Sequence, residues 1–311
     1  MMGENERYHE PVMLRQSVEG LITNDEGVYV DATFGGGGHS REVLSVLRQN
    51  GRLIAFDRDP EAAGNAPDDP RFKFISGDFR HLKNSLRFIG VTAIDGLLAD
   101  LGVSSHQFDE AGRGFSIRLD GPLDMRMDTA SPLTAAKVVN EYDRDELIRI
   151  LREYGEVPAA HRVADAIVDA RNANPLKTTD QLVDAVRPLF KGPKINRFLA
   201  QVFQAVRLEV NGEMEALKDL LNQSAQVVKP GGRLVVISYH SLEDRPVKRF
   251  MKTGGFTGEM KKDFHGNPLR PFVPMKGMPL VPTEEEIEKN NRARSAKLRI
   301  ATRNEQPFEI H

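Results

Sequence analysis

Short apolar runs recur along this chain, and most of them end in an acidic residue. Their apolar positions are mostly consecutive, which is typical of parallel strands buried on both faces of a sheet. The runs cover residues 28–31, 51–57, 72–79, 94–100 and 229–238. The pattern predicts an α/β fold with a doubly wound, Rossmann-like sheet, and a ligand site at the carboxyl ends of its strands.

A helical pattern interrupts the strand pattern from about residue 132 to residue 210. Two capping-box candidates begin helices there, Asp143 with Glu146 and Thr178 with Gln181, and apolar residues follow at spacings of three and four. This predicts a helical substrate-recognition domain inserted between the fourth and fifth strands; a separate small helical domain gives the same pattern. The expected parts are the first section of the sheet domain at 1–128, the insertion at 129–208 and the second section at 209–311.

Two segments near the end of the chain show weaker patterns. Residues 254–282 are rich in glycine and proline, which predicts a loop. Residues 296–303 alternate between apolar and polar positions, which predicts an edge strand that closes the sheet.

Four consecutive glycines, residues 35–38, follow the first predicted strand and precede a predicted helix. Glycines allow a sharp turn and a close backbone approach to a ligand, as in nucleotide-binding loops. A phosphate-binding P-loop would have Lys and Ser/Thr where His39 and Ser40 stand, and a dinucleotide fingerprint from Gly35 finds Ser40 in place of its third glycine. The motif therefore predicts a nucleotide-like cofactor without naming it, and a glycine cluster with no ligand stays an alternative.

The second strand ends at Asp57, at the distance expected for a carboxylate that binds ribose hydroxyls. The last apolar strand is introduced by Lys229-Pro-Gly-Gly. This series of strands ending in acids, with a Pro-Gly-Gly turn before the fifth, resembles S-adenosylmethionine-dependent methyltransferases.

Composition narrows the function further. The chain of 311 residues is 40% hydrophobic and 28% charged, it has no apolar run of about 20 residues, and its polar start lacks a signal-peptide core, so we expect a cytoplasmic protein with no membrane partner. It contains no cysteine, which removes disulfides and thiolate metal sites, and disfavours methylation of pyrimidine C5 through a cysteine adduct. The eight histidines include no close-spaced ligand pair, so no metal is expected.

Positive charge is concentrated near the end of the chain. Residues 245–303 carry a balance of +8, whereas the whole chain has a formal net charge of −2. Basic segments supply the phosphate contacts that dominate nucleic-acid affinity, although solvated surface charge gives the same pattern.

Four further segments identify a family: residues 8–14, 99–107, 113–128 and 238–245. Together with the glycine run, they resemble the bacterial ribosomal RNA small-subunit methyltransferase H family, also called MraW, over residues 8–303. The resemblance implies a class I methyltransferase sheet with an inserted α-helical domain. It also implies transfer of a methyl group from S-adenosylmethionine to the N4 amine of a cytidine in the decoding region of small-subunit (16S) ribosomal RNA.

The same resemblance implies a set of cofactor-binding residues. They are Gly37, Gly38, His39, Asp57, Phe79, Asp100 and Gln107. Alternatives stay open for three of them: a strand-end cap for Asp57, core packing for Phe79 and a helix cap for His39.

We further hypothesise that Asp100 accepts a hydrogen bond from the N4 amine during transfer, with a pure cofactor-binding role as its competitor. Polar candidates for substrate binding are Asp124, Arg126, Tyr239, His240, Ser241, Glu243, Arg245, Arg292 and Arg294. A structural ion pair is the alternative for Asp124 with Arg126. Lys297 and Arg299 could join Arg292 and Arg294 in binding phosphate.

The chain departs from the family pattern at three places. Tyr239 stands where Phe is common, Asn291 replaces a Pro, and the region from Ile195 differs from the frequent His-Pro-Ala-x-Arg version until it rejoins that version at Phe203-Gln-Ala. These differences leave the reaction class unchanged and put in question how the insertion contacts RNA.

Two other classes of function share parts of these patterns. A nicotinamide-dependent oxidoreductase would share the first strand–loop–helix unit, and a non-catalytic RNA-binding or ribosome assembly factor could keep the fold. A hydrolase using His240 and Ser241 is disfavoured, because no Gly-x-Ser-x-Gly motif is present. The sequence leaves open whether free RNA or an assembled small subunit is the partner.

Overall fold

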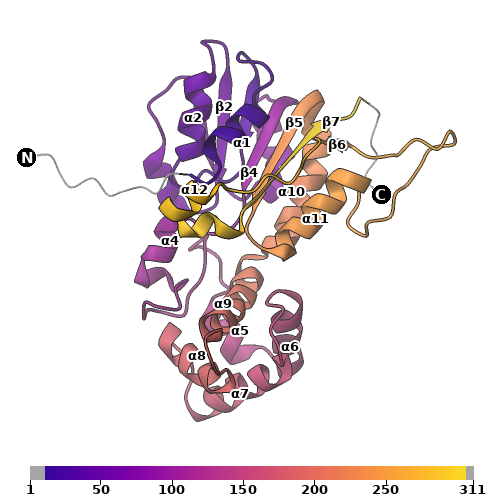
Figure 1. The fold of residues 1–311 in the computed structure, drawn as a ribbon. Coiled ribbons are helices and arrows are strands. Elements are labelled where there is room, and N and C mark those ends of the chain that lie inside the picture. Colours follow the sequence, from indigo (N-terminus) through magenta and orange to yellow (C-terminus); the bar gives the residue numbers. More distant parts are fainter. Residues whose placement is uncertain (1–10, 306–311) are drawn as a thin grey trace, which may run out of the picture. The chain divides into compact units, whose positions relative to one another are not determined.

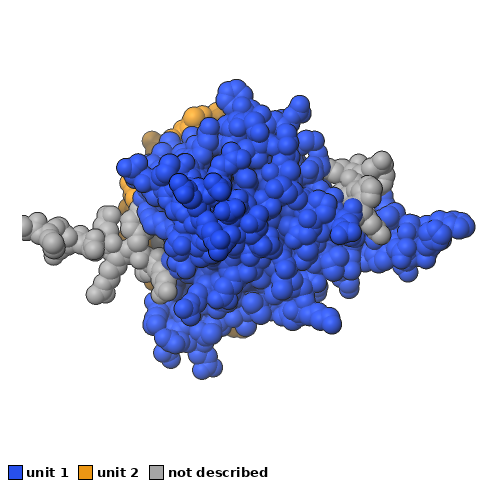
Figure 2. Space-filling view, turned by 90° about the horizontal axis from the view of Figure 1, so that it is seen from above, with its two compact units in different colours: residues 1–102, 215–311 blue, residues 103–214 orange. Residues whose placement is uncertain are grey.

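A computed structural model describes residues 11–305 of the chain. It divides into two compact units, coloured separately in Figure 2: unit 1 comprises residues 1–102 and 215–311, and unit 2 comprises residues 103–214. The domain boundaries expected from the sequence were 128/129 and 208/209. The difference at the first boundary has a physical reason, since Phe115, Leu123, Met125 and Met127 are buried in the core of the helical unit.

Unit 1 is built on one seven-stranded sheet (Figure 1) with the order β3-β2-β1-β4-β5-β7-β6. Its strands are β1 (Val28–Asp31), β2 (Arg52–Asp57), β3 (Phe72–Ser76), β4 (Ile94–Asp100), β5 (Val228–Ser238), β6 (Phe272–Pro274) and β7 (Lys297–Arg303). The first five are parallel, whereas β7 runs antiparallel to both β5 and β6. The predicted doubly wound α/β sheet is confirmed.

Two details of the predicted sheet are wrong. The segment 296–303 is not an edge strand, because β7 pairs with β5 on one side and with β6 on the other. Four consecutive β7 residues are buried, as expected for an interior strand. The edge strand is β6, which lies inside the segment 254–282 that was predicted as a loop.

Alternate residues of the strands face opposite helical layers. On β4, Leu97 and Ala99 pack in one core cluster and Leu98 in another. The Leu97 face is covered by α3 (Leu82–Phe88), α10 (Glu213–Val227) and α11 (Ser241–Thr253), and the Leu98 face by α1 (Leu14–Leu21) and α2 (Gly38–Val46). Shorter elements of this unit are η1 (Pro60–Asn65), η2 (Phe79–His81), α12 (Glu284–Lys289) and η5 (Asn291–Ser295). This layering holds the carboxyl ends of β1, β2 and β4 side by side.

Unit 2 is helical, as the periodicity predicted. Its helices are α4 (Ser105–Asp109), η3 (Ala111–Arg113), α5 (Ala135–Glu141), α6 (Arg144–Glu153), α7 (Ala160–Ala173), α8 (Thr179–Val186), η4 (Arg187–Leu189) and α9 (Ile195–Asn211). The side chain of Asp143 caps α6 by accepting from the Glu146 N–H, and Thr178 and Gln181 form a reciprocal capping box at α8. The predicted helix starts are confirmed.

Candidate cofactor and catalytic site

The loop between β1 and α2 contains the glycine run, and its backbone requires glycine. Gly35 and Gly37 have φ angles of 51° and 76°, and a Cβ on Gly37 would lie 2.8 Å from the Phe34 ring. The helix α2 begins directly afterwards at Gly38. Its unpaired N–H groups and the positive end of its dipole therefore lie at the carboxyl edge of the sheet, where an anionic group would be stabilised.

Asp57, the last residue of β2, holds this loop in place. Its carboxylate accepts hydrogen bonds from the Gly35 N–H at 2.7 Å and from the Asp59 N–H at 2.8 Å. Burial raises the pKa of Asp57, and these two hydrogen bonds oppose the rise. The structure thus contains the strand-end cap that was the alternative for Asp57. A carboxylate has about four acceptor positions, so the same group can also accept from hydroxyls.

His39 lies buried in the first turn of α2 and is neutral. Its Nε2 lies 3.2 Å from the Val12 carbonyl oxygen, which can only accept, so Nε2 carries the proton. Burial lowers the pKa of His39 to about 4. The unprotonated Nδ1 lies 3.9 Å from Oδ2 of Asp100.

Asp100 ends β4 and is anchored by two hydroxyl groups. Its backbone N–H donates to Oγ1 of Thr33 at 2.7 Å, and its Oδ1 accepts from the Tyr239 hydroxyl at 2.9 Å. Burial raises the pKa of Asp100 to about 7, the charges of Asp31 and Glu243 add to the rise, and the Tyr239 hydrogen bond opposes it. A carboxyl group with this pKa can accept a proton near neutral pH.

Asp31 was not among the predicted site residues, although it ends the strand before the glycine loop. Asp31 is buried, accepts from the Ser40 hydroxyl at 2.7 Å and from the Thr33 N–H at 3.0 Å, and has its pKa raised to about 6, chiefly by burial. Its place as the acid closing β1 was the available signal. Tyr239 was predicted as a polar candidate for the base pocket and as a departure from the family pattern, but nothing local indicated its contact with Asp100.

We call Asp31, Asp57 and Asp100 the strand-end acids, since they close the adjacent strands β1, β2 and β4. Within residues 11–305, no lysine or arginine forms an ion pair with any of them, although the nearby charge of Arg58 partly offsets the rise in the pKa of Asp57. Buried carboxylates without a cationic partner are costly to ionise. These acceptors therefore fit a ligand that carries positive charge and hydroxyl donors, and the N-terminus of α2 fits a carboxylate; S-adenosylmethionine has all three groups.

The two other predicted cofactor residues have local structural roles. Phe79 begins η2 and packs, partly buried, against the core under α3 and α10, which matches its core-packing alternative. Gln107 lies in unit 2, where its side chain accepts from the Ser104 N–H at 3.2 Å in the capping box of α4.

Asp124 and Arg126 form an ion pair within unit 2. Two guanidinium nitrogens of Arg126 donate to the two carboxylate oxygens of Asp124 at 2.8 and 2.7 Å, and a third donates to the carbonyls of Thr129 and Ser131. Although burial opposes it, the Arg126 hydrogen bonds lower the pKa of Asp124. This geometry matches the structural ion pair that was the alternative to base binding.

The segment 239–245 forms the junction between β5 and α11. The buried Glu243 carboxylate accepts from the N–H groups of Tyr239 and His240 at 3.0 and 3.3 Å, which caps the helix. Ser241 and Arg245 are exposed, and Arg245 donates to the Ser241 carbonyl at 3.1 Å.

One expectation for the basic segment is wrong. Arg299 is not available to phosphate, because it is buried and its guanidinium binds both carboxylate oxygens of Asp244 at 2.6 and 3.1 Å. Lys297 lies 3.5 Å from the same carboxylate. Arg292 and Arg294 lie exposed on η5 and keep their predicted role as an expectation.

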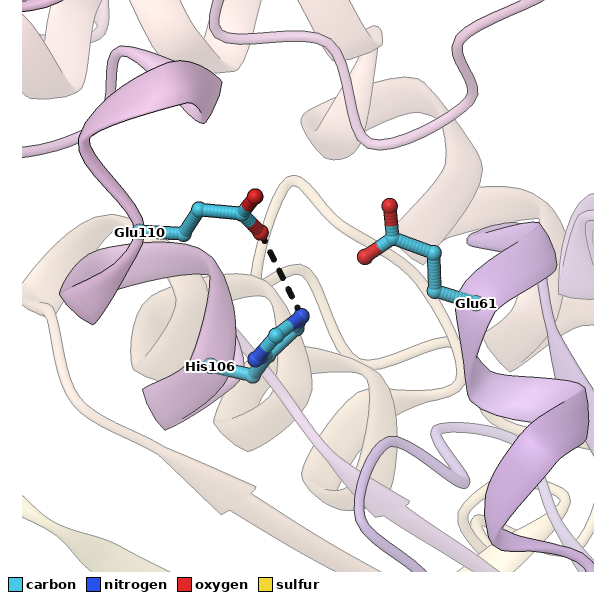
Figure 3. Close-up of side chains that lie close together, drawn as sticks. All are labelled: Glu61, His106 and Glu110. Atoms are coloured by element: carbon cyan, nitrogen blue, oxygen red, sulfur yellow. Dashed lines mark ion pairs between the residues drawn. The ribbon is translucent and has the colours of Figure 1, made fainter.

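Figure 3 draws His106 and Glu110, which form an exposed ion pair at 3.4 Å across one turn of unit 2, together with Glu61 of unit 1. Exposed acids beside a histidine are common without a metal, and we assign none. Among residues 11–305, no helix combines the length and the apolar character needed to cross a bilayer. Residues 8–10 of the first resemblance segment and the polar start of the chain lie outside the described residues.

Known proteins support the family assignment across nearly the whole chain. The model of the MraW methylase family matches residues 6–304. Relatives named ribosomal RNA small subunit methyltransferase H come from Parabacteroides distasonis (52% identical over 295 residues, 94% of this chain and 97% of the relative), Amoebophilus asiaticus (53% over 298 residues, 95% and 96%) and Flavobacterium johnsoniae (54% over 294 residues, 94% and 97%). The chain belongs to the MraW methylase family of S-adenosylmethionine-dependent methyltransferases.

Proposed function

We propose that this protein transfers the methyl group of S-adenosylmethionine to the N4 amine of a cytidine in small-subunit ribosomal RNA, in the cytoplasm. The printed names of the relatives support the RNA class, and the resemblance of the four sequence segments supports the cytidine amine. One structural observation carries the chemistry: Asp100, held by Tyr239, is a partly buried acceptor at the carboxyl edge of the sheet, and no lysine or arginine of the described residues forms an ion pair with it.

Different groups of the cofactor would bind at different places along the carboxyl edge of the sheet. The N-terminus of α2, at Gly37 and Gly38, would receive the methionine carboxylate. Asp57 would accept from the ribose hydroxyls, and Phe79 would lie beside the adenine. When bound, the cofactor supplies an electrophilic methyl group on a positively charged sulfur, and the strand-end acids would stabilise that charge.

The cytosine amine needs help from the protein, since its lone pair is delocalised into the ring. As the nitrogen forms its bond to the methyl carbon and the sulfur–carbon bond breaks, positive charge develops on the amine. Asp100 in its ionised form would accept a hydrogen bond from N4–H and then its proton, which leaves a neutral methylated amine. His39, neutral and with Nδ1 unprotonated, adds no repelling positive charge beside this step.

RNA binding is proposed for exposed basic residues of unit 1. The exposed side chains are Arg245, Arg292 and Arg294. Each would contact RNA phosphates, and the affinity that these contacts supply would fall as the salt concentration rises. The target base must be unstacked or single-stranded to reach a partly buried acceptor.

The direct test is nucleoside mass spectrometry of ribosomal RNA, both free and in small subunits, after incubation with the protein and labelled S-adenosylmethionine. We expect label in N4-methylcytidine. Label in another nucleoside would contradict the proposed site, and no label in either substrate would contradict the proposed enzyme.

The matched variant is Asp100→Asn, which keeps the shape of the side chain and removes the proton acceptor. We expect kcat at saturating cofactor to fall by about 100-fold or more, the range for a lost general base. Full turnover in this variant would contradict the role of Asp100 as proton acceptor and would favour a role in cofactor binding alone.

A further inference from the structure

We propose that Tyr239 is a positioning residue for the methyl-transfer step, whose hydroxyl fixes the orientation of the Asp100 carboxylate and favours its ionised form. This inference rests on the proposed role of Asp100 as acceptor. It adds a residue from a different strand to that site.

The contact is set by the sheet. Asp100, the last residue of β4, is registered opposite Ile237 of the parallel strand β5, and Tyr239 follows β5 by one residue. The Tyr239 hydroxyl donates to Oδ1 of Asp100 at 2.9 Å. The Tyr239 backbone is fixed in turn, because its N–H donates to Glu243 at 3.0 Å, and its ring packs partly buried against the core under α1 and α2.

The remaining neighbours of Asp100 do not favour its charge. Asp31 on β1 and Glu243 on α11 are acids, and Glu286 on α12 acts on Tyr239 with the same sign. His39 on α2 is neutral, and its Nδ1 lies 3.9 Å from Asp100, beyond hydrogen-bonding distance. Within the described residues, the Tyr239 hydroxyl is the one side-chain donor within hydrogen-bonding distance of the Asp100 carboxylate. A hydrogen bond donated to a carboxylate stabilises its ionised form and fixes its orientation.

The contact predicts a specific pH effect for Tyr239→Phe, a change that removes only the hydroxyl. Since that hydroxyl opposes the rise in the pKa of Asp100, its loss should raise this pKa further above 7. We expect the acid limb of the kcat profile to move to higher pH. With a shift of about one unit, kcat would be roughly tenfold lower at pH 6 and close to that of the unchanged protein at pH 9.

A matched control exists in unit 2, where the Tyr142 hydroxyl donates to Glu209, also at 2.9 Å. Tyr142→Phe removes a hydrogen bond of the same kind and should leave the midpoint of the pH profile unchanged. An equal loss of kcat at every pH in Tyr239→Phe, or an unchanged profile, would overturn the inference.

A second measurement needs no turnover. In cofactor-free protein labelled with ¹³C at the aspartate carboxyls, the signal missing from Asp100→Asn identifies Asp100. We expect its titration midpoint near pH 7 in the unchanged protein and higher in Tyr239→Phe. An unchanged midpoint in Tyr239→Phe would overturn the inference about Tyr239 and leave the proposed acceptor role of Asp100 intact. Full turnover of Asp100→Asn together with a shifted midpoint would overturn the acceptor role, while the effect of the Tyr239 hydrogen bond on Asp100 would stand.

Discussion

Acidic side chains inside the two units differ in whether they have a cationic partner, and the contrast is clearest between unit 2 and the strand-end acids of unit 1; the buried Arg299–Asp244 pair shows that unit 1 also contains complete pairs. In unit 2, Arg207 and Glu213 are both largely buried and bind each other through two hydrogen bonds of 2.9 and 3.1 Å, and Asp124 is paired with Arg126. In unit 1, Asp31 is buried and Asp57 and Asp100 are partly buried, and none of these strand-end acids forms an ion pair with an arginine or lysine of the described residues. An acid paired with an arginine is already neutralised by the protein itself. The strand-end acids lack such an ion pair, so a bound cationic ligand could neutralise them.

The largest expected effect comes from breaking a complete pair. Arg207→Met would remove both hydrogen bonds that the largely buried Glu213 accepts from the guanidinium, and we expect the free energy of unfolding to fall by about 3–5 kcal/mol. Urea denaturation followed by circular dichroism measures this. The control is Lys218→Met at the more exposed pair with Glu215, where a change of at most about 1 kcal/mol is expected. Equal effects at both pairs would remove the distinction between buried and surface charge in this protein.

Removing the charge of a strand-end acid should increase the stability of the fold rather than decrease it. The pKa of Asp100 is raised to about 7 in the folded protein from an ordinary value of 3.8, so folding favours its protonated form. The resulting cost to stability is absent below about pH 4, grows as the pH rises and is complete above about pH 7. Asp100→Asn removes a charge whose desolvation the Tyr239 hydrogen bond offsets only in part, and we expect a gain on the order of 1–3 kcal/mol at pH 8 and none at pH 4. Thermal unfolding of both proteins at the two pH values tests this, and a loss of stability at pH 8 would show that the acid has a stabilising partner.

A smaller effect should come from the glycine loop. Gly37→Ala places a Cβ against the Phe34 ring at a φ angle of 76°, so the loop must shift. We expect about tenfold weaker binding of S-adenosylhomocysteine in isothermal titration, since roughly 1–2 kcal/mol of strain falls on the loop. Gly64→Ala is the control, because a Cβ there meets nothing within 4 Å. Unchanged affinity in Gly37→Ala would contradict the role of this loop in binding the cofactor.

The smallest effect concerns exposed charge. Reversing Arg292 and Arg294 to Glu should weaken RNA binding mainly at low salt and reduce the slope of log K against log salt concentration by about 1 for each phosphate that the variant no longer binds. Arg299 is unsuitable for this test, because its guanidinium is held by Asp244. A filter-binding series with 16S ribosomal RNA at several salt concentrations gives the slope, and an unchanged slope contradicts phosphate binding by these arginines.

The sequence predicted the features that depend on neighbouring residues. Uninterrupted apolar runs marked the parallel strands, the glycine run marked the loop, and Asp143 and Thr178 marked helix starts through side chains that cap N–H groups three residues away. These signals are local, so a single sequence carries them.

Pairings between distant segments escaped prediction. The Arg299–Asp244 ion pair joins residues 55 positions apart, and the hydrogen bond from Tyr239 to Asp100 spans 139 positions. The insertion of β7 between β5 and β6 depends on sheet pairing, which the alternation of residues 296–303 does not specify. In each case the partner is decided by topology rather than by spacing along the chain.

The position of β7 also has a consequence for synthesis of the protein on the ribosome. One side of β5, an apolar strand, can pair only when β7 emerges, about 60 residues later. At roughly 5–20 residues per second, this leaves an unpaired strand edge for several seconds in every newly made chain. During this interval the free edge of β5 could pair with a strand of another chain, so the late position of β7 exposes the nascent protein to aggregation.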